Sequence, residues 1–230
     1  MAALICRDIK IAWRTGGGVM ALAFFALVAV LLPLGLGAEG RYVTTLVPGL
    51  LWIIMLLACL FSLDNLFRGD EEDGSLDIIR ISPLLREWPL SLEGTVLAKC
   101  LAHWLMTGAI LTFAAPIVGL MLGVDIAVLP ALFLTMLIGT PALSLTGAVG
   151  ACLTLELRHA GLLMPLLLLP LQTPVLIFGA GALSIFVSGD AMGQESATLF
   201  IRPLLFLASF SLAALVLAPL VAAAALRGRS

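Results

Sequence analysis

Charged residues are scarce in this chain. Only 11% of its 230 residues are charged, whereas 62% are hydrophobic, and the mean hydropathy is +1.18. This composition is typical of a membrane protein that crosses the bilayer several times. The apolar runs are continuous and do not alternate with a period of two residues, which excludes a transmembrane β-barrel.

Sequence motifs of common enzymes are also missing. The chain has only two lysines, Lys10 and Lys99, and neither follows the glycines of a G-x-x-x-x-G-K-[ST] loop. H-E-x-x-H and G-x-S-x-G are absent, and the apolar runs hold no paired carboxylates or clustered metal ligands. The four cysteines form no C-x-x-C, so we expect neither a disulfide nor a metal site. We therefore predict that the chain is not an enzyme and that ATP hydrolysis, if needed, takes place on a separate subunit.

Six apolar runs are long enough to span a membrane as helices, since about 20 residues suffice. The predicted spans cover residues 19–37, 44–63, 101–123, 129–155, 162–184 and 199–226. These runs predict an all-α polytopic fold, with residues 1–230 forming one six-helix transmembrane domain. A cleaved signal peptide is the alternative for the first run, but that run is long and five others follow it.

The distribution of Lys and Arg predicts the orientation. Ten basic residues outside the spans fall on the side of both termini, and only Arg41 and Arg202 fall on the opposite side. By the positive-inside rule, both termini face the cytoplasm. We expect a multi-pass protein of the bacterial inner membrane.

The N-terminal segment, residues 1–18, has the pattern of an interfacial helix. Ile5, Ile9 and Trp13 recur at a spacing of four residues, and basic residues lie on another face. A simple topology signal is the alternative interpretation.

The segment 64–99 concentrates the charge of the chain, with twelve of its 26 charged residues. A charge at the bilayer centre costs roughly 2.5 to 3.5 kcal/mol, so this segment is expected to stand in cytoplasmic water. Acidic residues 70–73 come directly before Gly74. Leu76 and Ile79, three residues apart, would share one face of a helix, and Pro83 follows them. This order predicts a short amphipathic helix at the membrane surface, with a solvated loop as the alternative.

Two further sets of polar residues could serve transport. His103 and His159 could ligate haem, although a lone histidine near an interface is more often hydrogen-bonded or solvated. Trp104, beside His103, could contact haem or serve in packing, and Trp52 is expected to be a packing or interface aromatic.

The fifth span contains three prolines, which remove backbone donors and predict a kinked or broken helix. A moving or substrate-lining element and a static kink are both compatible with this pattern. The positions of interest are Pro165, Pro170, Gln172, Thr173 and Pro174.

Four blocks of sequence together resemble the haem exporter protein B family (CcmB), the membrane subunit of the cytochrome c maturation ABC transporter. They are LFRGDEEDGSL at 66–76, LAKCLAHWLMTG at 97–108, LIGTP at 137–141 and LPLQTPVLIF at 169–178. The D-G-S-L turn followed by S-P also resembles the loop after the second span of ABC-2-type permeases. In those proteins a short helix there docks into a groove of the cytoplasmic ATPase.

The resemblance implies haem delivery to the periplasm for c-type cytochrome biogenesis, with haem as substrate, ATP on a partner subunit, and no cofactor bound by this chain. The implied partners are a cytoplasmic ABC ATPase, a tryptophan-rich haem-handling membrane subunit, a small membrane subunit and a periplasmic haem chaperone. A second copy of the chain is also expected, because six spans are few for a transport pathway. Residues 64–99 would form the coupling segment, with Leu76 and Ile79 in the groove of the ATPase. The candidate coupling residues are Arg68, Asp70, Asp73, Gly74, Ser75, Leu76, Ile79 and Pro83.

Two rival functions stay open at this point. One is an ABC-2-type permease for a lipid, glycan or drug. The other is a non-transporting scaffold that assembles the haem-handling complex and relays ATPase strokes to it. Whether ATP hydrolysis is coupled to haem export or to release of a haem-loaded chaperone also stays open.

Overall fold

The computed structural model describes residues 2–36, 40–63, 65–76, 91–155, 160–187 and 194–228, and within these ranges it is helical, without strands. The helices are α1 (Ala2–Thr15), α2 (Gly17–Leu36), α3 (Gly40–Leu63), α4 (Asn65–Glu72), α6 (Leu92–His103), α7 (Ala109–Met121), α8 (Leu129–Thr154), α9 (Ala160–Val187) and α10 (Gln194–Arg227). A π-helical turn, η2 (Trp104–Gly108), joins α6 to α7, and a 3-10 turn, η3 (Ile126–Val128), precedes α8. The predicted all-α fold is confirmed.

Length and hydropathy identify the helices that can cross a membrane. Five stretches qualify among the described residues: Leu46–Glu72, Leu92–Met121, Ile126–Thr154, Leu163–Ile185 and Leu199–Arg227. The pair Leu4–Arg14 and Gly17–Leu32, bent by 54°, raises the number to six if it is taken as one span. The bend falls at Gly16, whose φ of 71° lies in the left-handed region that favours glycine. The chain is a polytopic membrane protein.

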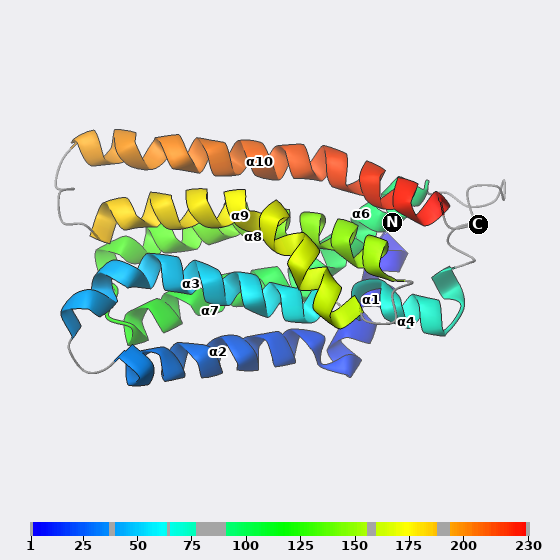
Figure 1. Ribbon diagram of the computed structural model, residues 1–230, viewed down its shortest axis with the longest axis horizontal. Coiled ribbons are helices and arrows are strands. Elements are labelled where there is room, and N and C mark those ends of the chain that lie inside the picture. The colour runs from blue at the N-terminus through cyan, green and yellow to red at the C-terminus, as the bar shows by residue number, and fades with distance from the viewer. Residues whose placement is uncertain are drawn as a thin grey trace.

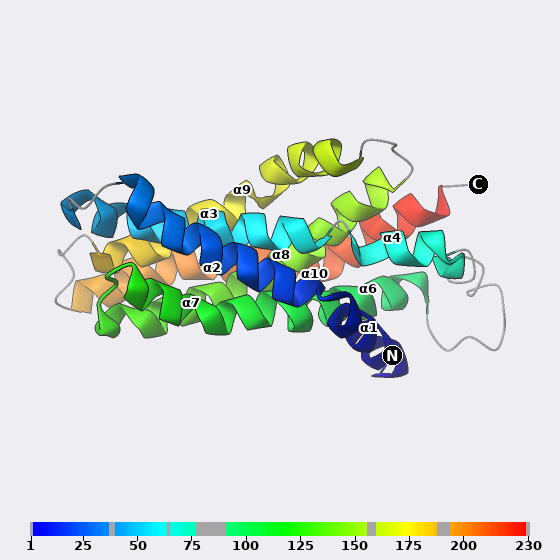
Figure 2. The same ribbon diagram turned by 90° about the horizontal axis from the view of Figure 1, so that it is seen from below.

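The long helices lie side by side as a bundle (Figure 1). Both chain termini lie at one end of this bundle, together with α1, α4 and the start of α6 (Figures 1 and 2). This end is called the terminal end below. The placement agrees with the prediction that both termini lie on one side of the membrane.

Helix α8 forms the centre of the bundle, in contact with α3, α6, α7, α9 and α10. All residues from 142 to 152 are buried. Glycines allow the close approach: a Cβ at Gly147 would lie 2.2 Å from Leu63, and one at Gly150 would lie 2.4 Å from Leu168. The stretch of α8 next to α3 and α9 therefore has no room for side chains at these positions.

Helix α9 contains Pro165, Pro170 and Pro174 and is bent but continuous, with its first part turned away from the bundle (Figure 2). The predicted kink is thus observed, and the predicted break is not. Gln172 is fully buried, and its Nε2 donates to the carbonyl of Leu143 at 3.3 Å. Thr173 is exposed and donates to the Leu169 carbonyl of its own helix. The two polar residues therefore face different surroundings and do not line a common path.

The predicted cytoplasmic segment 64–99 is helical in the described residues near both of its ends. Helix α4 continues the second span to Glu72, and α6 begins at Leu92, where the hydroxyl of Ser91 accepts a hydrogen bond from the Gly94 N–H at 3.2 Å. Residues 92–99 are therefore helical, and Lys99 is buried. Of the predicted coupling and haem residues, Ile79, Pro83 and His159 lie outside the described part of the chain.

Candidate functional site

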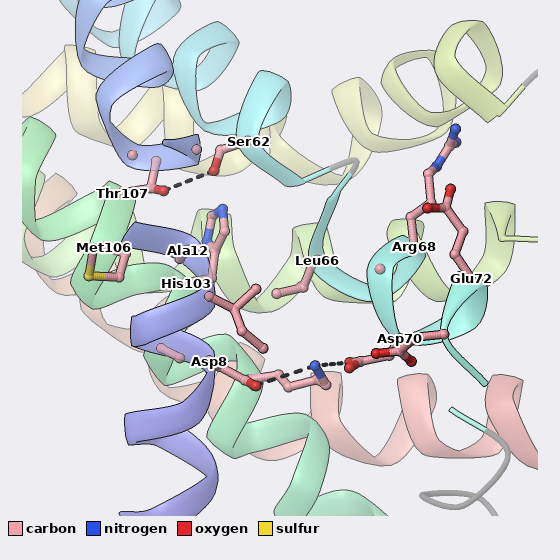
Figure 3. A pocket seen from close by; sticks show the side chains of 17 residues that line it. Asp8, Ala12, Ser62, Leu66, Arg68, Asp70, Glu72, His103, Met106 and Thr107 are labelled. Carbon is pink, nitrogen blue, oxygen red and sulfur yellow. Dashed lines mark hydrogen bonds and ion pairs between the residues drawn. The ribbon is translucent and has the colours of Figure 1, made fainter. Parts of the chain in front are cut away.

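A cavity of about 600 Å³ lies at the terminal end, between α1, α3, α4 and α6 (Figure 3). Its wall combines apolar side chains from α1, α4 and η2 with polar and charged ones. Its polar and charged residues include Asp8, Ser62, Asp70, Lys99, His103 and Thr107.

Four charged residues form a network beside this cavity, called the charge cluster: Arg7, Asp8, Asp70 and Lys99. Lys99 Nζ lies 3.3 Å from Asp8 Oδ2 and also pairs with Asp70 Oδ2. Arg7 Nη2 lies 2.9 Å from both Asp8 Oδ1 and Asp70 Oδ1. The Lys99 and Asp70 side chains are only 5% and 7% exposed. Two positive and two negative charges balance, and they connect α1, α4 and α6.

The Lys99 ammonium has a further partner, the ring of Phe67, whose centroid is 5.6 Å from Nζ. A cation over an aromatic face gains roughly 0.5 to 2 kcal/mol, depending on its desolvation. Charges inside a membrane bundle are normally paired in this way. Removing one partner of a buried pair typically costs about 3 to 5 kcal/mol, because the remaining charge is left uncompensated.

His103 lies one helical turn after Lys99 and lines the same cavity. Its Nδ1 is 3.0 Å from the Ser144 hydroxyl of α8, and its Nε2 is buried without a hydrogen-bond partner. A neutral imidazole that donates from Nδ1 presents a lone pair at Nε2, which is the usual arrangement of a metal-ligating histidine. The orphaned nitrogen makes His103 the strongest candidate ligand in the cavity.

Trp104 has a structural role at the start of the π-helical turn. Its Nε1 donates to the Thr140 hydroxyl at 3.0 Å, and Thr140 is 3.2 Å from the hydroxyl of Thr112. Thr112 in turn donates to the carbonyl of Gly108 at 2.7 Å. Single π-helical turns within α-helices are frequent at functional sites. Trp104 is not among the residues that line the cavity.

The predicted turn after the acidic residues is present. Gly74 has a φ of 74°, and Asp73 Oδ1 accepts a hydrogen bond from the Ser75 N–H at 2.8 Å. Hydrogen bonds from the hydroxyl and the backbone N–H of Ser75 hold the pKa of Asp73 below its ordinary value. The turn geometry was predictable from D-G-S alone, whereas its role in coupling stays a prediction.

Other predicted coupling residues are more buried than the sequence suggested. Leu76 is only 4% exposed and packs into the hydrophobic core of the bundle, and its docking into a groove of a partner stays a prediction. An apolar side chain at the end of a transmembrane bundle is more stable against that bundle than in water. Arg68 is half-buried and lines the cavity, with its side chain beside that of Glu72 (Figure 3). Asp70 is likewise buried in the charge cluster.

Sequence reasoning missed the roles of Arg7, Asp8 and Lys99. Lys99 and His103 are four residues apart and so share one face of a helix, which was the available signal. The partners of Lys99 could not be read from the sequence, since Asp8 and Asp70 lie on separate helices.

A metal centre made of protein side chains alone is not found in the described ranges: no group of three or more His, Cys, Asp or Glu residues is arranged to hold an ion. Among the cysteines, Cys6 is exposed, whereas Cys59, Cys100 and Cys152 are buried.

Comparison with known proteins gives a consistent result over the full length. The family described as CcmB protein matches residues 1–229. Heme exporter protein B of Paracoccus denitrificans is 49% identical over 228 residues, covering 99% of this chain and 98% of that protein. Heme exporter protein B of Bradyrhizobium diazoefficiens is 45% identical over 99% of this chain and 97% of its own length. Heme exporter protein B of Pseudomonas aeruginosa is 45% identical over 97% of this chain and 95% of its own length. On this evidence the chain belongs to the CcmB protein family.

Proposed function

We propose that this chain is the membrane permease subunit of an ABC transporter complex that delivers haem to the periplasm for c-type cytochrome biogenesis. The observation that carries the proposal is the 49% identity to a Heme exporter protein B over 99% of the chain. The subunit is not an ATPase, because its sequence contains no P-loop. A partner ATPase therefore supplies the energy.

The ATPase docks at the terminal end, on the segment that joins α4 to α6. Glu71, Glu72, Asp73 and Gly74 are exposed there, and the Asp73 hydrogen bond orders the turn. An exposed acidic surface on an ordered turn suits a basic groove on a cytoplasmic partner. The docking surface therefore consists of these acids and the chain that follows them, with Leu76 as the internal anchor.

Site-specific photo-crosslinking tests this docking. A crosslinking amino acid in place of Glu71 should capture the ATPase in membranes, whereas the same amino acid in place of Arg202 should not. Arg202 is a matched control, because it is equally exposed and belongs to the opposite end of the bundle in the predicted topology. Equal capture at both positions, or capture at neither, would contradict docking at the terminal end.

Haem contacts this subunit through His103. Three observations support this: the unpartnered Nε2, the Ser144 hydroxyl that orients the ring, and a cavity of about 600 Å³ with apolar walls that include Ile11, Leu66 and Met106. A pocket of this size is within the range of small-molecule sites. Imidazole is a common axial ligand of haem iron, so Nε2 would supply one bond to the substrate.

Absorbance of the purified complex tests the haem contact. His103→Ala should remove or shift a haem band and lower the yield of c-type cytochromes, and His159→Ala should change neither. An unaltered spectrum and an unaltered yield for His103→Ala would refute haem ligation here.

The remaining partners are a tryptophan-rich haem-handling membrane subunit, a small membrane subunit, a periplasmic haem chaperone and a second copy of the chain. An exposed apolar stripe on α10, formed by Leu212, Val216 and Leu220 at spacings of four residues, supports contacts with other membrane helices or lipid. The complex lies in the inner membrane, with both termini of this chain in the cytoplasm. Co-purification with a C-terminal tag should recover the ATPase and the membrane subunits together.

A non-transporting scaffold that relays ATPase strokes to the haem-handling complex is the second candidate function. It is favoured by the interior polar groups of the bundle, since Gln172, Thr112 and Thr140 hydrogen-bond within the chain and do not line the cavity. A normal cytochrome yield for His103→Ala, combined with loss of yield when the ATPase is removed, would favour this scaffold.

A further inference from the structure

We propose that Lys99 is a positioning residue that transmits displacement of α4 to α6. This inference rests on the proposed function, in which the ATPase acts on the segment after α4. Lys99 lies between the docking surface and His103, and neither ATPase docking nor haem ligation by itself requires a lysine there.

The docking turn and the cavity are connected through contacts between α4 and α6. Asp70 lies on α4, three residues before Asp73 of the docking turn, and the Asp73 N–H donates to the Gly69 carbonyl of α4 at 3.1 Å. Movement of the docking turn therefore moves the Asp70 carboxylate with it. Asp70 pairs with Lys99, which lies on α6 one turn before His103. A continuous series of contacts therefore runs from the docking surface, through one ion pair, to the wall of the cavity.

Both partners of the Lys99–Asp70 ion pair are buried. The Lys99 and Asp70 side chains are 5% and 7% exposed, so movement of α4 alone would separate two poorly hydrated charges at a cost in free energy. Buried ion pairs seldom add net stability compared with apolar side chains of similar size, and their best-attested use is to fix one arrangement of elements. The Lys99–Asp70 pair thus favours joint movement of α4 and α6 over separate movement.

Lys99 lies shortly before an irregular turn of its helix. The π-helical turn begins at Trp104, immediately after His103, and separates α6 from α7. Irregular turns of this kind let the two parts of a helix move differently. A displacement delivered at Lys99 would therefore reposition His103 and α6 without dragging the whole of α7.

The test uses Lys99→Met in the complete complex, because methionine keeps much of the length of lysine and removes its charge. Crosslinking of the ATPase through residue 71 and ATP hydrolysis should be unchanged. The yield of c-type cytochromes per ATP hydrolysed should fall by about tenfold or more, which is the size of a typical coupling between sites. A yield per ATP equal to that of the unaltered chain would overturn the proposal.

A matched control is Arg227→Met. Arg227 also forms an ion pair with α6, through Glu93, but its side chain is 56% exposed. Exposed pairs contribute little, so this variant should deliver haem normally. A loss of yield per ATP equal to that of Lys99→Met would show that any ion pair on α6 matters, and it would overturn the specific role of Lys99.

The double variant Lys99→Met/Asp70→Asn separates coupling from folding. It removes one positive and one negative charge together, so the cluster stays neutral and the protein should fold even if Lys99→Met does not. It should dock the ATPase and remain uncoupled; full recovery of delivery would overturn the proposal. Failure of the proposed function gives a different result, namely no crosslink to an ATPase in the unaltered chain.

Discussion

Gly179 of α9 lies directly against the indole ring of Trp52 of α3, so closely that a Cβ at Gly179 would be 2.3 Å from Cε2. Gly139 of α8 faces the same ring, and Trp52 is fully buried. One aromatic side chain therefore fills the space that two glycines leave open on neighbouring helices. This packing holds α3, α8 and α9 together in the middle of the bundle.

Gly179→Ala should destabilise the protein, because the indole has no room to move away from an added methyl group. Overpacking of this kind costs roughly 1 to 3 kcal/mol. The measurement is the thermal unfolding midpoint in detergent. Gly181→Ala, two residues away with no atom within 4 Å of the added Cβ, should be neutral or stabilising by about 0.5 to 1 kcal/mol. Similar midpoints for the two variants would contradict the role of Trp52.

Gly74→Ala should weaken the docking surface through the backbone alone. The φ of 74° costs roughly 1 to 2 kcal/mol for a residue with a Cβ, and no neighbouring atom lies within 4 Å to add a steric clash. Crosslinking of the ATPase through residue 71 should therefore decrease. Gly69→Ala, in α4 with ordinary helical geometry and equally open surroundings, should leave it unchanged.

The turn at Asp73 should be insensitive to pH near neutrality. Hydrogen bonds from Ser75 lower the pKa of Asp73 below 3.8, so the stabilisation by the charged carboxylate is complete above that value and is lost as the pH falls through the folded-state pKa. Hydrogen-exchange protection of the Ser75 amide should be constant from about pH 5 to pH 8. In Asp73→Asn, protection should be weaker and independent of pH down to the acid limit. Titration of the protection above pH 5 would contradict this assignment.

The hydrogen bond from Trp104 to Thr140 should appear as an energetic coupling. Trp104→Phe removes the donor and Thr140→Val the acceptor, so the double variant should be less destabilised than the sum of the single ones by about 0.5 to 1.5 kcal/mol. Thr135→Val serves as the comparison, because Thr135 donates to the Leu132 carbonyl of its own helix. Its effect should add to that of Trp104→Phe within about 0.5 kcal/mol.

Some features followed from local sequence and others did not. The apolar runs identified the long helices because hydropathy depends only on neighbouring residues, and the same is true of the Asp73–Gly74 turn. Hydropathy also counts the free-energy cost of burying Asp70 and Lys99 separately for each residue, and it therefore predicted that both are exposed to water. Their burial depends on pairing between helices: Arg7 and Asp70, for example, are 63 residues apart in sequence. The position of Leu76 has the same cause, since only the folded bundle offers an apolar surface to this side chain.

The bend at Gly16 separates α1, with its share of the charge cluster, from the rest of the bundle. Helix α1 contributes Arg7 and Asp8 to the charge cluster, one charge of each sign, and α4 and α6 contribute Asp70 and Lys99, again one of each. The cluster therefore consists of two neutral halves joined side by side. If α1 swings away about Gly16, no unbalanced charge stays behind in the membrane on either side. Helix α1 thus covers one side of the cavity without setting the net charge of the Lys99–Asp70 pair.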